Sequence, residues 1–272
     1  MHDSGKEPRR VRGAARAAAA CAVAAMLLGP AVAGAEPVRM RYPEGPTHGF
    51  LVLSDVATDK PIARGELIQW IERGAIVSRL VFYFDDGSLY DETVRFSQRP
   101  VFKVLSYHLI QKGPSFSEPC DNEFDSSGRY RARLRSSPDG EEQTDSGVTE
   151  IPADVSNGMM STLLKNLPRG ASATVHIMTF RPKPMVLDLE LTPEGTDRYW
   201  VGKTAQLATR FLVKPKVGGV KGVFATIAGK QPPEVRMWIG QGRAPSLVRF
   251  EGPIYYEGPP WRVELSAPRW KE

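Results

Sequence analysis

The chain of 272 residues carries 36 Lys and Arg against 31 Asp and Glu, and it has only two cysteines. Its 41% hydrophobic and 25% charged residues are ordinary for a soluble globular protein, whereas 25 Gly and 23 Pro favour many turns and short strands. Five of the basic residues and two of the acidic ones precede residue 36, so the remainder is nearly neutral. Nucleic-acid binding normally requires a broad positive field, and we therefore expect no nucleic-acid partner.

The first 35 residues have the three-part pattern of an export signal. A basic stretch ends at Arg16, the apolar run AAAACAVAAMLLGPAVA follows, and the tripeptide AGA that ends at Ala35 provides a cleavage site. We expect cleavage there, one mature domain at 36–272 without a later transmembrane segment, and a periplasmic or secreted location. An uncleaved anchor and lipidation of Cys21 are the alternatives, but the run is short for a bilayer span and Cys21 lies inside it.

Period-two alternation dominates the rest of the chain and predicts antiparallel strands with one apolar and one polar face. The segment from Ser78 to Phe84 alternates in this way, a turn follows at 85–88, and LYDETVRF resumes the alternation, which together predict a hairpin. We expect further strands at 101–112, 186–191, 207–214, 235–239 and 261–266, and polar loops at 113–128 and 136–146.

One amphipathic helix is predicted at about 154–167. Apolar residues recur every four positions from Val155 onward, and Pro168 ends the pattern. The apolar segment 220–227 lies between glycines and a Pro-Pro pair, and its pattern leaves open whether it forms a helical turn. The predicted fold is therefore mainly β, with ten to twelve antiparallel strands in one domain and one principal helix against the sheet.

Several stretches of the chain carry a resemblance to known proteins. They are VFYFDDGSLYDETVRFSQ at 81–98, NGMMSTLLKNLPRG at 157–170, the strand at 185–191, LATRFLVK at 207–214, EVRMWI at 234–239 and APSLVRFEG at 244–252. In their order they resemble a family of uncharacterised bacterial envelope proteins, similar in outline to the periplasmic lipoprotein carriers LolA and LolB. The resemblance implies a strongly curved antiparallel sheet, a half-barrel or clamshell, with the helix against its concave face. In the carriers this concavity holds acyl chains.

Motifs for nucleophilic or metal-assisted catalysis are absent from the sequence. It contains neither the serine-hydrolase patterns G-x-S-x-G and S-x-x-K nor the zinc pattern H-E-x-x-H. Cys120 could act as a nucleophile beside His48, His108 or His176, but a lone loop cysteine is more often structural. Once the signal is removed Cys120 also has no disulfide partner. The three histidines would meet on a metal only through the fold, so we expect no metal and no cofactor.

Paired acidic residues and a phosphate-binding motif also give no support for catalysis. Asp91 and Glu92 are adjacent in a predicted strand, so their side chains point to opposite faces and do not flank one bond as in a glycosidase. Asp188 and Glu190 share a face that alternates with leucines, which indicates a solvated surface. The sequence GKT at 202–204 lacks the rest of a phosphate-binding loop.

Eleven Phe, five Trp and eight Met remain to fill a core or to line an apolar cavity. Methionine adapts to varied apolar shapes, so the predicted helix suits a lid over an apolar ligand. The candidate ligand-binding residues are Phe82, Phe84, Met159, Met160, Leu163, Phe211 and Trp238. We predict an exported, non-catalytic envelope protein that binds an acyl chain, a lipid or a lipoprotein in the concavity. The alternatives are a structural or adaptor protein with a filled core and a protein partner, and a hydrolase assembled only by the fold.

Overall fold

The structure of the chain is a computed structural model that describes residues 1–2, 38–216, 234–255, 257–266 and 268–270. The chain divides into two compact units, Met1–Gly34 and Ala35–Glu272, and the described secondary structure belongs to the second unit. The predicted export signal with Cys21 and the apolar segment 220–227 lie outside the described residues. The predictions made for these segments therefore stay predictions.

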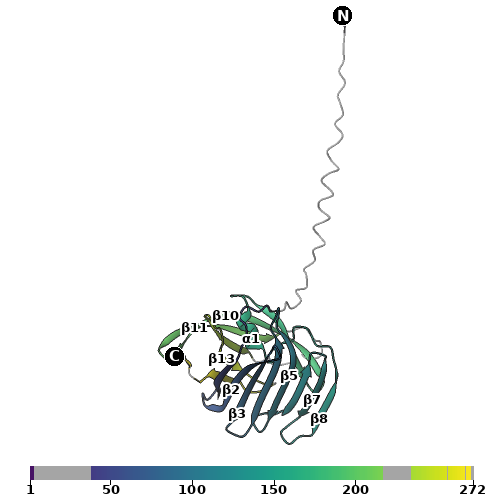
Figure 1. Ribbon diagram of the computed structural model, residues 1–272, viewed down its shortest axis with the longest axis vertical. Helices are drawn as coiled ribbons and strands as arrows, with labels where there is room; N and C mark the ends of the chain where they lie inside the picture. Colours follow the sequence, from purple (N-terminus) through teal and green to yellow (C-terminus); the bar gives the residue numbers. More distant parts are fainter. Residues whose placement is uncertain (3–37, 217–233, 256, 267, 271–272) are drawn as a thin grey trace. The chain divides into compact units, whose positions relative to one another are not determined.

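Fifteen strands and one helix make up the described part of the second unit (Figure 1). The first eight strands are β1 (Thr47–Asp55), β2 (Pro61–Glu72), β3 (Ala75–Phe84), β4 (Leu89–Ser97), β5 (Lys103–Lys112), β6 (Cys120–Asp125), β7 (Arg129–Arg135) and β8 (Glu142–Val148). Helix α1 (Met160–Asn166) follows, and then come β9 (Ala173–Phe180), β10 (Pro184–Val201), β11 (Thr204–Pro215), β12 (Val235–Gly240), β13 (Leu247–Gly252), β14 (Trp261–Leu265) and β15 (Pro268–Trp270).

The strands form one antiparallel sheet in the order β15-β10-β11-β12-β13-β14-β1-β2-β3-β4-β5-β6-β7-β8. Strand β9 lies off this path and pairs with β10. Strand β1 joins the two halves, because it pairs with β14 along one edge and with β2 along the other. Among the described residues the path ends at β8 and β15 and does not close. The mainly β, antiparallel fold predicted from the alternation is confirmed.

The tight hairpin predicted at 85–88 is also confirmed, between β3 and β4. Gly87 has φ of 84°, a left-handed conformation that glycine adopts without steric cost. The carboxylate of Asp86 accepts a hydrogen bond of 2.8 Å from the backbone N–H of Ser88, and the N–H of Phe84 donates to the carbonyl of Ser88 at 3.0 Å. The turn thus joins two strands whose residues stay in continuous register.

The two polar loops expected at 113–128 and 136–146 are wrong in part, because they contain β6 and the start of β8. Strand β8 is the last strand of the order, and six of its seven residues are exposed. Its sequence therefore lacks the alternation of apolar and polar residues that predicts a strand. In β6 the inward positions include the polar residue Asn122 and only one aromatic residue, Phe124. Pairing with neighbouring strands, rather than hydrophobic alternation, defines these two elements.

The helix is shorter than the expected 154–167, since α1 begins at Met160 and ends at Asn166. The preceding segment instead pairs with the free edge of β9. Val155 forms a parallel bridge with His176, and the side chain of Asn157 bonds the backbone N–H and C=O of Met178 at 2.7 and 2.8 Å. These bonds satisfy backbone groups that the edge of β9 would otherwise leave without partners. Because residues 155–157 adopt an extended pairing with β9, they do not form part of the helix.

The larger of two packed clusters shows that the sheet is strongly curved. The larger cluster joins residues of β3–β7 to residues of β9–β12, which lie far apart in the strand order, and α1 packs among them through Leu163 and Leu164. The second cluster joins β1, β2, β3 and β4 to β14 and includes Phe82, Phe116 and Trp261. Faces so distant along one sheet meet only if the sheet bends around them. The expectation of one principal helix against the concave face is confirmed.

Candidate functional site on the concave face

The seven residues predicted to bind an apolar ligand fall into three groups in the structure. Met159, Leu163 and Phe211 are buried in the larger cluster, and Met160 packs against it. Phe82 and Phe84 are buried in the second cluster, and Trp238 lies in a third, small cluster. The fold therefore does not bring the seven together as one lining.

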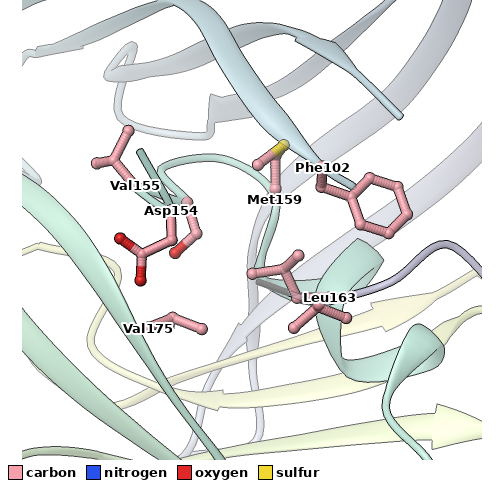
Figure 2. Close-up of a pocket in the computed structure, with 8 residues that line it drawn as sticks. Phe102, Asp154, Val155, Met159, Leu163 and Val175 are labelled. Atoms are coloured by element: carbon pink, nitrogen blue, oxygen red, sulfur yellow. The ribbon is translucent and has the colours of Figure 1, made fainter. Parts of the chain in front are cut away.

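In the part of the chain that the structure describes, side chains fill the space beneath α1. Figure 2 shows Phe102, Met159, Leu163 and Val175 converging there, around a cavity of about 10 Å³. A volume of that size accommodates about one water molecule, whereas pockets for small molecules measure about 300–1,000 Å³. The region under the helix thus belongs to the packed core, and α1 is part of that core.

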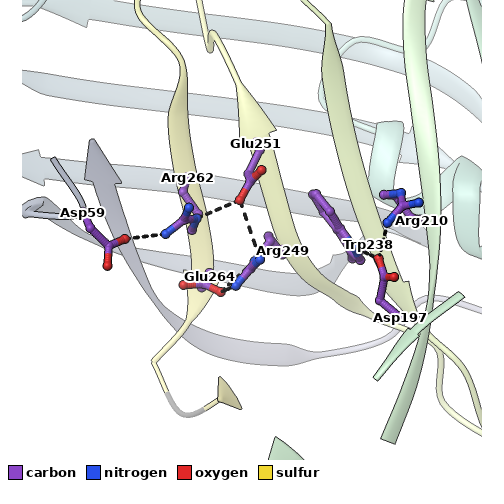
Figure 3. A network of polar contacts seen from close by, with 8 residues as sticks. All are labelled: Asp59, Asp197, Arg210, Trp238, Arg249, Glu251, Arg262 and Glu264. Carbon is purple, nitrogen blue, oxygen red and sulfur yellow. Dashed lines mark hydrogen bonds and ion pairs between the residues drawn. The ribbon is translucent and has the colours of Figure 1, made fainter. Parts of the chain in front are cut away.

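Trp238 is buried on the outer face of the second half of the sheet, opposite the concave face. Its indole N–H donates to the carboxylate of Asp197 at 2.6 Å, and the guanidinium of Arg249 lies 5.5 Å from the centre of its ring. Figure 3 shows how Arg249 continues into a network of ion pairs across β13 and β14 with Glu251, Arg262 and Glu264. Charged pairs therefore cover the outer face at this place.

A row of partly exposed residues crosses the concave face between the two packed clusters. The strand register places five residues side by side on neighbouring strands β2–β6, and we name this line the central row. Its members, in strand order, are Leu67, Leu80, Glu92, Leu109 and Asn122. The first four keep intermediate exposure, whereas neighbours along the same strands, such as Phe82, Tyr90 and Tyr107, are buried. Leu109 contacts both clusters, which places the row between them.

Glu92 is the charged member of the central row. Tyr107 donates a hydrogen bond of 2.8 Å from its hydroxyl to Oε1 of Glu92, and the hydroxyl of Tyr90 is a second hydrogen-bond partner. Although part of the residue reaches solvent, burial of the carboxyl group raises the pKa of Glu92 above its ordinary value, and the two phenols oppose this rise only in part. Asp91 points to the outer face and pairs with Arg79, as the alternation predicts.

Three polar side chains extend the site beyond Glu92. Gln111 is buried, and the thiol of Cys120 contacts its amide oxygen at 3.5 Å. The amide oxygen of Asn122 is buried and has no hydrogen-bond partner among the described residues. Burial raises the pKa of Cys120 to about 12, which keeps the thiol protonated at neutral pH. The concave face thus combines apolar side chains with a few polar groups, as many ligand sites do.

We expect the Cys120 thiol to be nearly unreactive in the folded protein. Thiolate is the reacting species, and a pKa of about 12 lowers its fraction at pH 8 on the order of a thousandfold relative to a free cysteine. Iodoacetamide labelling at pH 8, read by mass spectrometry of the peptide that contains Cys120, should be slower by about that factor in buffer than in 8 M urea. Equal rates in the two conditions would contradict the burial of the thiol.

His48, His108 and His176 each bind carboxylates rather than one another. His176 lies between Asp154 and Asp188, with N–O distances of 2.7 and 3.3 Å, so Asp188 is not simply solvated as expected. The other two pair across neighbouring strands, His48 with Glu66 and His108 with Asp121. Among the described residues no group of three or more His, Cys, Asp or Glu side chains is arranged to hold a metal ion.

The outer face carries a hollow of about 460 Å³ over β1–β3. Phe50 and Tyr83 line it and are 58% and 56% exposed, and Arg64 and Glu66 lie on β2 between them. Exposed aromatic side chains beside charged groups are common on protein surfaces that bind partners. This hollow lies on the opposite side of the sheet from the central row.

A scan of protein-family models, a search of curated proteins and a search of solved structures found no match to this chain. The resemblance to the lipoprotein carriers and the expectation of a non-catalytic protein therefore stay predictions. None of the described helices has the length and apolarity that crossing a membrane requires.

The amino-acid sequence itself contains a signal for Glu92. In LYDETVRF the positions of Tyr90, Glu92, Val94 and Phe96 share one face, so a carboxylate stands among apolar residues. Charged side chains are usually solvated, so a carboxylate on an apolar strand face is a candidate functional residue. The partners of Glu92 on β5 had no sequence signal, because they depend on the register of β4 with β5.

Proposed function

We propose that this chain is an exported, non-catalytic protein of the cell envelope that binds an apolar ligand on its concave face. The single observation that carries the proposal is the central row, in which Leu67, Leu80 and Leu109 stay partly exposed between two buried clusters. Partly exposed leucines on an otherwise packed inner face provide a surface that a ligand would cover at a gain of about 25 cal/mol per Å². An acyl chain, a lipid or the lipid of a lipoprotein has the matching chemistry.

The proposed binding surface differs from the one predicted beneath the helix. The cavity of about 10 Å³ under α1 leaves no room for an acyl chain, whereas the central row lies on β2–β6. Of the predicted residues, Phe82 lies nearest in register, because it pairs with Tyr90 beside the row. Export is part of the proposal on the strength of the first 35 residues, whose basic, apolar and small-residue segments have the order of a signal peptide.

The test begins with protein purified from the envelope of the organism that makes it, extracted and examined by lipid mass spectrometry. A stoichiometric apolar molecule is expected in the extract. The delipidated protein should also bind an uncharged dansyl-labelled undecyl probe, and Leu80→Gln on the central row should weaken that binding about tenfold, since one apolar contact of about 1–2 kcal/mol is lost. Tyr83→Ser, on the outer face of the same strand, is the matched control and should leave it unchanged.

Failure of the proposal would be plain in this experiment. An extract without a stoichiometric lipid, together with no saturable binding of the probe by a folded protein, would overturn it. Equal weakening by Leu80→Gln and Tyr83→Ser would also overturn it, because the probe would then not distinguish the two faces.

A second candidate function, an envelope adaptor that binds a protein partner, is favoured by the outer hollow with its exposed Phe50 and Tyr83. A photo-crosslinking amino acid at position 83 should then capture one stoichiometric protein in intact cells. The same crosslinker at Val148, which is 74% exposed on β8, is the control site. Capture of the same set of proteins from both sites would count against an adaptor role for the hollow.

A further inference from the structure

Glu92 is the one formally charged side chain among the inward-facing residues of β3–β6. The inward positions beside it hold apolar or neutral polar side chains, including Leu80 and Leu109 on the adjoining strands and Tyr90 and Val94 on its own. All four of these strands lie within the described residues. A carboxylate in such surroundings loses much of its hydration, which is costly unless a partner compensates for it.

The described residues supply Glu92 with hydrogen bonds but with no cation. Its hydrogen-bond partners among these residues are the hydroxyls of Tyr107 and Tyr90, which are neutral donors. The nearest arginine in register, Arg79, points to the opposite face and forms a two-pronged ion pair with Asp91. Glu92 therefore differs from the carboxylates of the outer face, many of which pair with an arginine or a lysine.

The groups around Glu92 suit a positively charged ligand with an apolar body. The leucines of the central row offer contacts to an alkyl chain, and the carboxylate offers a counter-charge at the middle of the row. The rings of Tyr90 and Tyr107 flank the carboxylate, and aromatic rings attract cations through their electron-rich faces. An anionic or neutral head group would not compensate the carboxylate in this way.

We propose that Glu92 anchors the ammonium group of an amine-bearing apolar ligand, whose chain lies along Leu67, Leu80 and Leu109. This inference rests on the proposed function, since it names the chemical class of the ligand for the same concave surface. Binding is a reversible ion pair with hydrogen bonds, and no covalent bond forms or breaks.

The other titratable groups that face Glu92 stay neutral under the conditions of the test. Tyr90 and Tyr107 have pKa values raised well above their ordinary value by burial, and burial raises the pKa of Cys120 to about 12. Among these groups Glu92 is therefore the one whose ionisation brings a charge to this part of the concave face.

The test compares three probes of equal chain length, decylamine, decanol and decanoate, below their micelle-forming concentrations. Competition against the dansyl probe at pH 7.5 and low salt should show that the wild-type protein binds decylamine at least tenfold more tightly than decanol, and decanoate least tightly. Glu92→Gln should remove the preference for the amine and change decanol binding by less than threefold. Glu92→Met gives the same readout if the glutamine variant does not fold. Asp91→Asn, at the adjacent outward position, is the matched control and should keep the preference.

The outcomes separate this inference from the function on which it rests. Equal binding of decylamine and decanol by the wild-type protein, or an amine preference that persists in a folded Glu92 variant, would overturn the role of Glu92 while leaving apolar binding intact. Absence of binding for all three probes would instead overturn the proposed function itself.

Discussion

Replacing Phe116 with alanine is expected to lower the free energy of unfolding by about 3–5 kcal/mol. The Phe116 side chain comes from the segment between β5 and β6, yet it is 0% exposed. Its ring lies 5.4 Å from that of Phe84, 5.3 Å from that of Tyr255 and 6.1 Å from that of Trp261, all three in edge-to-face geometry. One side chain thus holds together the loop, β3 and the segment around β14, and its removal leaves a cavity that the surrounding rings cannot close.

Urea unfolding followed by tryptophan fluorescence would measure this effect. Phe50→Ala is the matched control, because it makes the same chemical change on a neighbouring strand at a side chain that is 58% exposed. Its cost should stay within about 0.5 kcal/mol. Similar costs for the two variants would mean that Phe116 is not packed as the structure places it.

Replacing Asn157 with alanine is expected to lower the free energy of unfolding by about 2–4 kcal/mol. The side-chain amide forms two buried hydrogen bonds with Met178, accepting from its backbone N–H and donating to its carbonyl. The alanine variant leaves both backbone groups buried without a partner, and each such group costs about 1–3 kcal/mol. The loss would release the segment before α1 from the edge of β9.

Ser156→Ala is the control for the Asn157 variant. The Ser156 hydroxyl donates to the carbonyl of His176, but the backbone N–H of Ser156 donates to the same carbonyl and remains in the variant. A cost of about 1 kcal/mol is therefore expected. Thermal unfolding by circular dichroism would rank the two variants, and a larger loss for Ser156→Ala than for Asn157→Ala would contradict the assigned bonding.

Alternation along the chain was sufficient to predict most of the strands around the site. The segment from Ser78 to Phe96 shows why, because its inward residues are almost all apolar and a DDG turn separates its two strands. Strands β6 and β8 escaped detection, since one has mixed inward residues and the other is almost fully exposed. A strand without an apolar face leaves no periodic hydrophobic trace, although its backbone still pairs.

The extent of the helix and the position of Trp238 could not be read from local patterns. Val155 fits the helical spacing, but its backbone pairs with that of His176. His176 lies on β9, some twenty residues further along the chain. Trp238 sits in an apolar-looking strand, yet its indole nitrogen needs a hydrogen-bond acceptor, which Asp197 provides on the outer face. Both outcomes depend on residues that are distant in the chain and adjacent only in the fold.

The amino-acid sequence alone determined a one-sided, antiparallel β architecture with one helix, because side-chain period and turn chemistry are local properties of the chain. Tertiary structure decided that described side chains fill the space beneath α1, that the partly exposed leucines lie on β2–β5, and that Glu92 stands among them without a described cation. Packing density and strand register arise only when distant segments meet, and these two quantities define the candidate binding surface across β2–β6.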